Sequence, residues 1–140
     1  MSVAYAYLCR FAEVNWDGTY DTQGAGLDTV RVDAIPATAS MAIVANVKAM
    51  GVMSEESPPI IIVLNLNYPD GESQELVNAT MRRHPITEEN RQGADDSANV
   101  IVNLGLVPLE AEGKHTFIMN LKSDQKQLEV SLSFFVILRK

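Results

Sequence analysis

The sequence is short of cysteine and of long apolar segments, and each shortage excludes a class of protein. Its single cysteine, Cys9, rules out an intramolecular disulfide, which small secreted domains commonly carry. No basic segment leads into an apolar stretch near residue 1, so no signal peptide is evident. The longest strictly aliphatic run, residues 60–64, is far shorter than the roughly 20 residues that span a bilayer. We therefore expect a soluble, cytoplasmic protein without a membrane partner.

Positive charge is also scarce. Eleven Lys and Arg residues stand against 18 Asp and Glu residues, which gives a formal net charge of −7. A field of this sign repels phosphate backbones and argues against a nucleic-acid partner. The only dense basic cluster, Arg82-Arg83-His84, is more typical of a solvated strand end than of a phosphate site. The length of 140 residues fits a single domain over 1–140 that folds without a metal or a disulfide.

The sequence does contain a clear strand pattern near its C-terminal end. Apolar and polar residues alternate through residues 128–138, which predicts a half-buried strand. The side chains expected to face the core are Leu128, Val130, Leu132, Phe134, Val136 and Leu138. Residues 117–121 alternate in the same way, and the short polar segment 122–126 between the two predicts a closing hairpin.

Further strands are expected upstream, separated by turns at residues 16–19 and 68–71 and by a long acidic loop at 86–97. They comprise residues 4–14 (interrupted at Arg10), 60–66, 75–83 with Val77, Ala79 and Met81 on the apolar face, and 99–109. Residues 60–66 are apolar on both faces, as expected of a central strand between two layers. Residues 34–53 are rich in Ala and Met, which suits a helix, but their alternation favours a strand.

These patterns predict an all-β fold. Short strands with frequent turn signals indicate a mostly antiparallel two-sheet β-sandwich, immunoglobulin-like or jelly-roll-like, with about seven to nine strands. A closed barrel is the alternative.

Several segments also resemble a known family. They are Leu8-Cys9-Arg10-Phe11-Ala12-Glu13-Val14, Asp17-Gly18, Gly24, Gly26, Leu106-Val107-Pro108-Leu109 and Gly113-Lys114-His115-Thr116-Phe117. Together they are similar to an uncharacterised bacterial family of short proteins. The resemblance covers nearly the whole chain and implies a β-sandwich fold with no assigned activity. The chain departs from the family in a longer polar loop around residues 88–99.

No catalytic or metal-binding constellation emerges from the sequence. Cys9 with His84 or His115 would supply a thiol and an imidazole, but Cys9 lies in an apolar strand pattern typical of a small buried hydrophobe. One cysteine and two distant histidines do not match a zinc site. Acidic turns offer oxygen ligands for calcium, although solvated turns explain them as well. We expect neither a cofactor nor enzymatic activity.

Two groups of residues are candidates for binding. Trp16, Tyr20 and Tyr68 lie at predicted turns, where they form either a platform for a sugar or small ligand or plugs for the ends of the sandwich. Ile118, Phe135 and Ile137 are large apolar residues on the polar side of the closing hairpin, where a second copy of the chain would cover them.

The sequence thus favours a non-catalytic interaction or assembly module that self-associates, with a dimer or another protein as partner. A carbohydrate- or small-ligand-binding module is the alternative, and a hydrolase using the acidic loop is a third hypothesis.

Overall fold

Ten strands and no helix make up the described part of the chain, which the computed structural model gives as residues 1–17, 19–48, 59–81 and 98–139. The strands are β1 (Ser2–Cys9), β2 (Phe11–Val14), β3 (Tyr20–Gln23), β4 (Thr29–Val32), β5 (Ala37–Lys48), β6 (Ile60–Asn67), β7 (Ser73–Met81), β8 (Ala98–Leu109), β9 (Gly113–Ser123) and β10 (Lys126–Leu138). The all-β prediction is confirmed, with ten strands instead of seven to nine.

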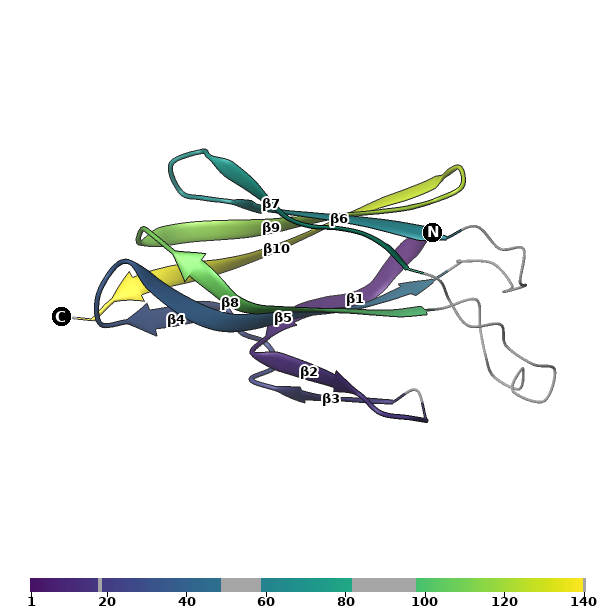
Figure 1. Cartoon of the computed structure of the whole chain (residues 1–140), viewed down its shortest axis with the longest axis horizontal. Helices are drawn as coiled ribbons and strands as arrows, with labels where there is room; N and C mark the ends of the chain where they lie inside the picture. Colours follow the sequence, from purple (N-terminus) through teal and green to yellow (C-terminus); the bar gives the residue numbers. More distant parts are fainter. Residues whose placement is uncertain (18, 49–58, 82–97, 140) are drawn as a thin grey trace.

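The strands form two facing sheets and a separate hairpin (Figure 1). One sheet has the order β4-β10-β9-β6-β7 and the other has the order β1-β5-β8. β2 and β3 pair only with each other and lie outside the three-stranded sheet. Every strand pair is antiparallel except β4 with β10, so the predicted, mostly antiparallel sandwich is confirmed.

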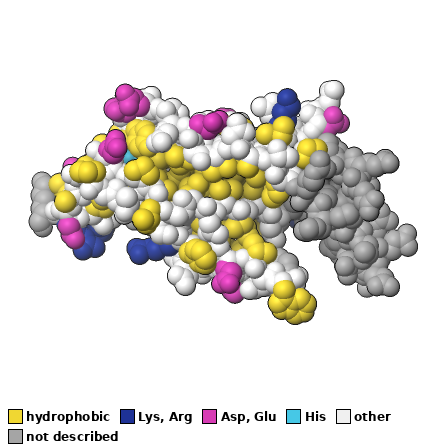
Figure 2. Space-filling model, in the orientation of Figure 1, with side chains coloured by type: hydrophobic (Ala, Val, Ile, Leu, Met, Phe, Trp, Pro, Cys, Tyr) yellow, Lys and Arg dark blue, Asp and Glu magenta, His cyan; other side chains and the backbone are white. Residues whose placement is uncertain are grey.

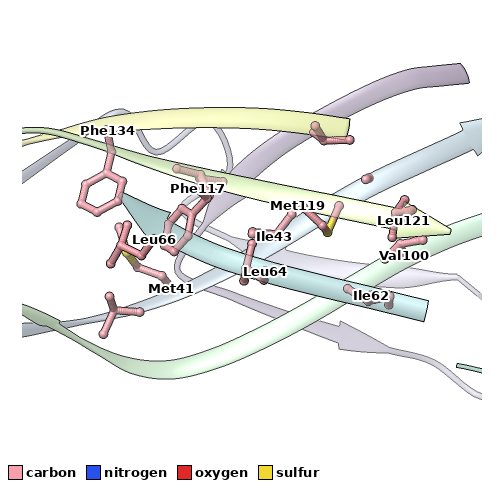
Figure 3. Close-up of a cluster of buried hydrophobic side chains, with 14 of the residues drawn as sticks. Met41, Ile43, Ile62, Leu64, Leu66, Val100, Phe117, Met119, Leu121 and Phe134 are labelled. Atoms are coloured by element: carbon pink, nitrogen blue, oxygen red, sulfur yellow. The ribbon is translucent and has the colours of Figure 1, made fainter. Parts of the chain in front are cut away.

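The core lies between the two larger sheets and is filled by alternate side chains of each strand. Figure 3 shows side chains of β6, β9 and β10 meeting those of β5 and β8 in this space. In β10, Val130, Phe134 and Val136 are buried between exposed neighbours, as predicted for this segment. The closing hairpin is also confirmed, because Ser123 pairs with Lys126 at its turn.

β5 is the strand that is covered on both faces. All residues from Met41 to Ala45 are buried, because Ile43 faces the main core while Ala42 and Val44 face the β2–β3 hairpin. On this outer face, Ala42 and Val44 pack with Cys9 and Ala12 beneath the hairpin. The strand prediction for residues 34–53 is confirmed over 37–48, and residues 49–53 lie outside the described part.

The prediction that residues 60–66 are packed between two layers is wrong. Burial alternates along β6, with Ile60 and Leu64 buried and Ile61 exposed. No described residue covers the outer face of the five-stranded sheet over Ile61. β6 is central within its sheet, between β9 and β7, but it is buried on one face only.

The β2–β3 hairpin is attached to the sandwich by a side chain that imitates strand pairing. The Ala12 N–H donates to Asn103 Oδ1 at 3.0 Å, and Asn103 Nδ2 donates to the Ala12 carbonyl at 2.6 Å. Asn103 thus satisfies both backbone groups of a residue that is almost fully buried. Beneath the hairpin, Ala12 packs with Cys9, Ala42 and Val44 in a second apolar cluster.

Along one side of the sandwich, the edge strands β7 and β8 leave an apolar gap between the sheets. Both strands carry a bulge here, with Leu76 and Leu104 as the extra residues, and a pocket of about 240 Å³ lies between them. Figure 2 shows the band of apolar side chains in this gap. Because of the bulge, Leu76 and Val77 are both half-buried while Ala79 is exposed, which corrects the apolar face predicted for residues 75–83. The predicted loop at 86–97 lies outside the described part.

Candidate functional site

Half of the exposed large apolar side chains in the described part lie on or beside the β2–β3 hairpin. Four of the eight exposed large hydrophobic residues in the described part belong to residues 5–16. Trp16, at the tip of the hairpin, is 98% exposed, and Val14 is 60% exposed. The apolar side chain at the hairpin tip is visible at the lower right of Figure 2. Contiguous exposed apolar patches mark interaction sites, whereas single exposed apolar residues are normal, so the arrangement of these side chains decides what they indicate.

The turn that presents Trp16 is held by local hydrogen bonds. The side chain of Asp17 accepts from both the backbone N–H and the hydroxyl of Thr19, as in an Asx turn. The Thr19 hydroxyl, and then its N–H, lower the pKa of the Asp17 carboxyl. Asn15 N–H donates to the Thr19 carbonyl at 2.7 Å and closes the turn. These bonds tie residues 15, 17 and 19 together, and the Trp16 side chain beside them is exposed.

Three tyrosines continue this surface from the hairpin onto β1. The hydroxyls of Tyr5 and Tyr20 lie 2.7 Å apart, and the rings of Tyr5 and Tyr7 stack with centroids 6.3 Å apart. The hydrogen bond from Tyr5, followed by burial, raises the pKa of Tyr20. Val14 pairs with Tyr20 across the hairpin and faces the same side. We call Tyr5, Tyr7, Val14, Trp16 and Tyr20 the hairpin surface.

Acidic residues lie on the other face of the hairpin. Glu13 and Asp21 are directly opposite each other in the β2–β3 register, an arrangement of like charges that disfavours the hairpin. Asn15 Nδ2 donates to Asp21 Oδ2 at 3.2 Å. Together with Asp17, these carboxylates give the hairpin a negative rim. Among the described residues, no three His, Cys, Asp or Glu side chains are grouped so that they could hold a metal ion.

The structure brings together two of the three predicted platform residues. Trp16 and Tyr20 share the hairpin, whereas Tyr68 follows β6 in the five-stranded sheet. There Tyr68 donates its hydroxyl to Gln74 Oε1 at 2.8 Å and its ring meets that of His115 edge-on. Burial, and then Glu110 and Asp70, raise the pKa of Tyr68. Tyr5 and Tyr7 take the place expected for Tyr68, and their i, i+2 spacing in the predicted first strand was the signal for it.

The predicted interface residues share one face of the five-stranded sheet but are not contiguous. Phe135 and Ile137 are 49% and 39% exposed and are neighbours on the outer face of β10. Ile118 pairs with Ser131, four residues before Phe135, and is half-buried. A hydrogen bond of 3.0 Å between Thr116 and Ser133 lies in the row between them.

The residues considered for catalysis are kept apart. Cys9 is buried under the hairpin, as expected of a small hydrophobe, and burial raises the pKa of its thiol. His115 is buried on the other sheet, stacked on Phe134 with ring centroids 5.1 Å apart. Its Nδ1 lies 3.1 Å from the carbonyl oxygen of Gly113, and its Nε2 has no partner among the described residues. His84 lies outside the described part.

The fold and its surfaces define a β-sandwich domain with a projecting hairpin. Comparison with protein families matches residues 4–134 to a family of unknown function, DUF6941. The chain belongs to this family, and the resemblance to an uncharacterised family is thereby confirmed. No helix in the described part is long and apolar enough to cross a membrane.

Other comparisons add little to this assignment. No curated protein matches the chain. Among solved structures, the chain is similar to a family 123 glycoside hydrolase from Clostridium perfringens that was studied for glycolipid glycan hydrolysis. The sequences are 11% identical and the TM-score is 0.34, with 81% of this chain covered. The chain spans about a quarter of the length of that enzyme, since 24% of the enzyme chain is covered.

Proposed function

We propose that this protein is a non-catalytic interaction module that binds another protein through the hairpin surface. The observation that carries the proposal is Trp16, which is 98% exposed at the tip of the hairpin, beside the bonded pair Asp17 and Thr19. Trp and Tyr are the residue types most enriched among the side chains that dominate protein–protein binding energy. An exposed indole on a held turn loses little conformational freedom when it is buried by a partner.

The charges around this surface describe the partner further. Asp17 follows Trp16 at the hairpin tip, whereas Glu13 and Asp21 lie on the opposite face, so the complementary surface is an apolar pocket with a Lys or Arg at the part of its rim that meets Asp17. Such a rim would act mainly on the rate of association, which we expect to fall as salt is added.

Site-specific photo-crosslinking tests the proposal. A benzophenone amino acid placed at Val14 would lie inside the hairpin surface, and one placed at Gln127 would lie on the exposed outer face of β10 as a matched control. We expect position 14, but not position 127, to crosslink one protein in cells of the native host, and Trp16→Ser to abolish this product. Equal products from both positions, or a product unaffected by Trp16→Ser, would refute the proposal.

A second candidate function is self-association through the outer face of β10. Phe135 and Ile137 support it, because burying each such side chain is worth roughly 1.5–3 kcal/mol. We expect light scattering to give a dimer that Phe135→Ser and Ile137→Ser convert to a monomer, while Gln127→Ser on the same strand leaves it intact. A wild-type monomer at micromolar concentration would contradict this proposal.

Carbohydrate or small-ligand binding is favoured less than protein binding. Its support is the pair of stacked rings of Tyr5 and Tyr7, because sugar rings pack on aromatic faces. Tyr68 does not join these rings, which leaves the expected platform incomplete. We place the module in the cytoplasm, a proposal supported by the single, buried cysteine.

A further inference from the structure

A groove lined by arginines lies where β4 of one sheet faces the start of β5 in the other. Its volume is about 440 Å³, and Arg10, Arg31 and Arg139 line it. These are all the arginines in the described part of the chain, and no Asp or Glu is among the described residues that line the groove. Figure 2 shows Lys and Arg side chains gathered at this end of the molecule. In a chain of net charge −7, the groove is a local reversal of sign.

The backbone holds Arg10 over the groove at the turn between β1 and β2. The Arg10 N–H donates to the carbonyl of Gln23 at 2.8 Å, and the hydroxyl of Ser40 donates to the Arg10 carbonyl at 3.0 Å. Gly24 has a φ of +66°, and a Cβ there would lie 2.9 Å from Cγ of Arg10. A glycine at position 24 therefore permits both the turn and the path of the Arg10 side chain.

The guanidinium groups of Arg31 and Arg139 are not neutralised by strong ion pairs within the described part of the chain. Arg139 lies 3.8 Å from Asp33, but both side chains are largely exposed and such pairs are weak. Arg31 has no ion pair with any described residue. Because guanidinium groups bind carboxylates in a planar, two-bond geometry, three of them in one groove favour a ligand with carboxylates.

The groove also contains a free strand edge. The carbonyl of Asp28 accepts from the N–H of Phe135 in β10, and that of Val32 accepts from the N–H of Arg139 just after β10. Thr29 pairs with Phe135 in parallel register. This register directs the backbone N–H and C=O groups of Thr29 and Arg31 away from β10, toward the open side of β4. No described residue bonds to them. Unpaired strand edges of this kind are templates for an added strand.

We propose that this groove binds an extended acidic peptide segment, which adds as a strand to the free edge of β4. The peptide backbone pairs with Thr29 and Arg31, and its carboxylates meet Arg10, Arg31 and Arg139. Alternate side chains of the added strand point inward toward Val30 and Val32, so the preferred segment alternates acidic and apolar residues. This site is separate from the hairpin surface and does not depend on the function proposed for it.

Fluorescence anisotropy with labelled, end-blocked peptides tests the proposal. We expect Glu-Val-Glu-Val to bind and Lys-Val-Lys-Val not to bind. Arg31→Gln should weaken binding about tenfold, the effect of losing a charge-assisted hydrogen bond. Lys48→Gln removes the same charge at the far end of β5 and should change the affinity by less than about twofold. Trp16→Ser should leave peptide binding intact, since the two surfaces are independent.

Two measurements separate strand addition from simple anion binding. Methylating the backbone nitrogens of the peptide should lower its affinity for the protein about tenfold without any change in the protein itself. Thr29→Pro removes a protein N–H that faces the groove, at the first position of an edge strand, where proline is tolerated. This substitution should weaken binding of the peptide but leave binding of succinate unchanged. Equal affinity of the methylated and unmethylated peptides would reduce the site to a carboxylate site and overturn the proposal. Binding of the lysine peptide, or no binding of the acidic peptide at millimolar concentration, would also overturn it.

Discussion

Replacing Asn103 tests how the hairpin is held on the sandwich. The Asn103 amide makes two hydrogen bonds to the backbone of Ala12, at 3.0 and 2.6 Å. Each such bond contributes about 1 kcal/mol net, and a buried backbone group left without a partner costs about 1–3 kcal/mol. We therefore expect Asn103→Ala to lower the free energy of unfolding by about 2–4 kcal/mol. Asn103→Asp keeps the acceptor but sets a carboxylate against the Ala12 carbonyl, so it should be at least as harmful.

The assay combines global and local measurements. Urea unfolding is followed by circular dichroism, because Trp16 is already 98% exposed and its fluorescence reports unfolding poorly. Cys9 lies beneath the hairpin in the cluster with Ala12, so its reaction with a thiol reagent reports lifting of the hairpin. We expect Asn103→Ala to accelerate this reaction.

Asn99→Ala is the matched control on the same strand. Asn99 accepts from Asn46 Nδ2 in an exposed contact, and its removal should cost less than about 0.5 kcal/mol. If Asn103→Ala were no more destabilising than Asn99→Ala and left the labelling of Cys9 slow, the amide would not be what holds the hairpin.

Three further predictions concern the hairpin and the layer beneath it. Cys9 should react slowly with thiol reagents in the native protein at neutral pH and rapidly in urea, because burial raises its pKa and shields it; rapid stoichiometric labelling of the folded protein would contradict this. The raised pKa of Tyr20 means that its stabilising contribution is complete below the ordinary value of 10.0 and is lost as the pH rises through the folded pKa. Tyr5→Phe should lower the Tyr20 pKa in an ultraviolet absorbance titration, and an unchanged titration would show that their hydroxyls do not interact. Ala42→Ile should destabilise the fold by about 1–3 kcal/mol through overpacking, whereas Ala79→Ile on the exposed face of β7 should be nearly neutral in thermal unfolding; equal effects would contradict the two-sided burial of β5.

The sequence predicted well those strands whose pairing is local. In β10 and β9 the alternation is long and one face is buried, so the period-2 pattern survives without interruption. It also predicted the turn at Trp16, since Asp-Gly is a local signal. The alternation of β6 was harder to see, because Ile61 is apolar although its side chain is exposed.

What sequence reasoning missed depends on contacts between distant segments. β4 has four residues, too few to show a period, and it is fixed by pairing Thr29 with Phe135. The outer face of β5 is buried only because the β2–β3 hairpin packs over it, and the local sequence of β5 does not reveal this contact. The arginine groove gathers positions 10, 31 and 139, which no local motif connects, whereas the arginines at 82–83 stand out in the sequence because they are adjacent.

The parallel pairing of β4 with β10 has a consequence for how the chain folds. The five-stranded sheet joins Thr29 to Phe135, so it is incomplete until Phe135 has been synthesised. Pairing across such a separation carries a large loop-closure entropy and predicts slow folding. Until then the edge of β9 that pairs with β10 has no partner strand, and the apolar side chains of β9 lack the cover of Phe134 and its neighbours, which makes the nascent chain prone to aggregation.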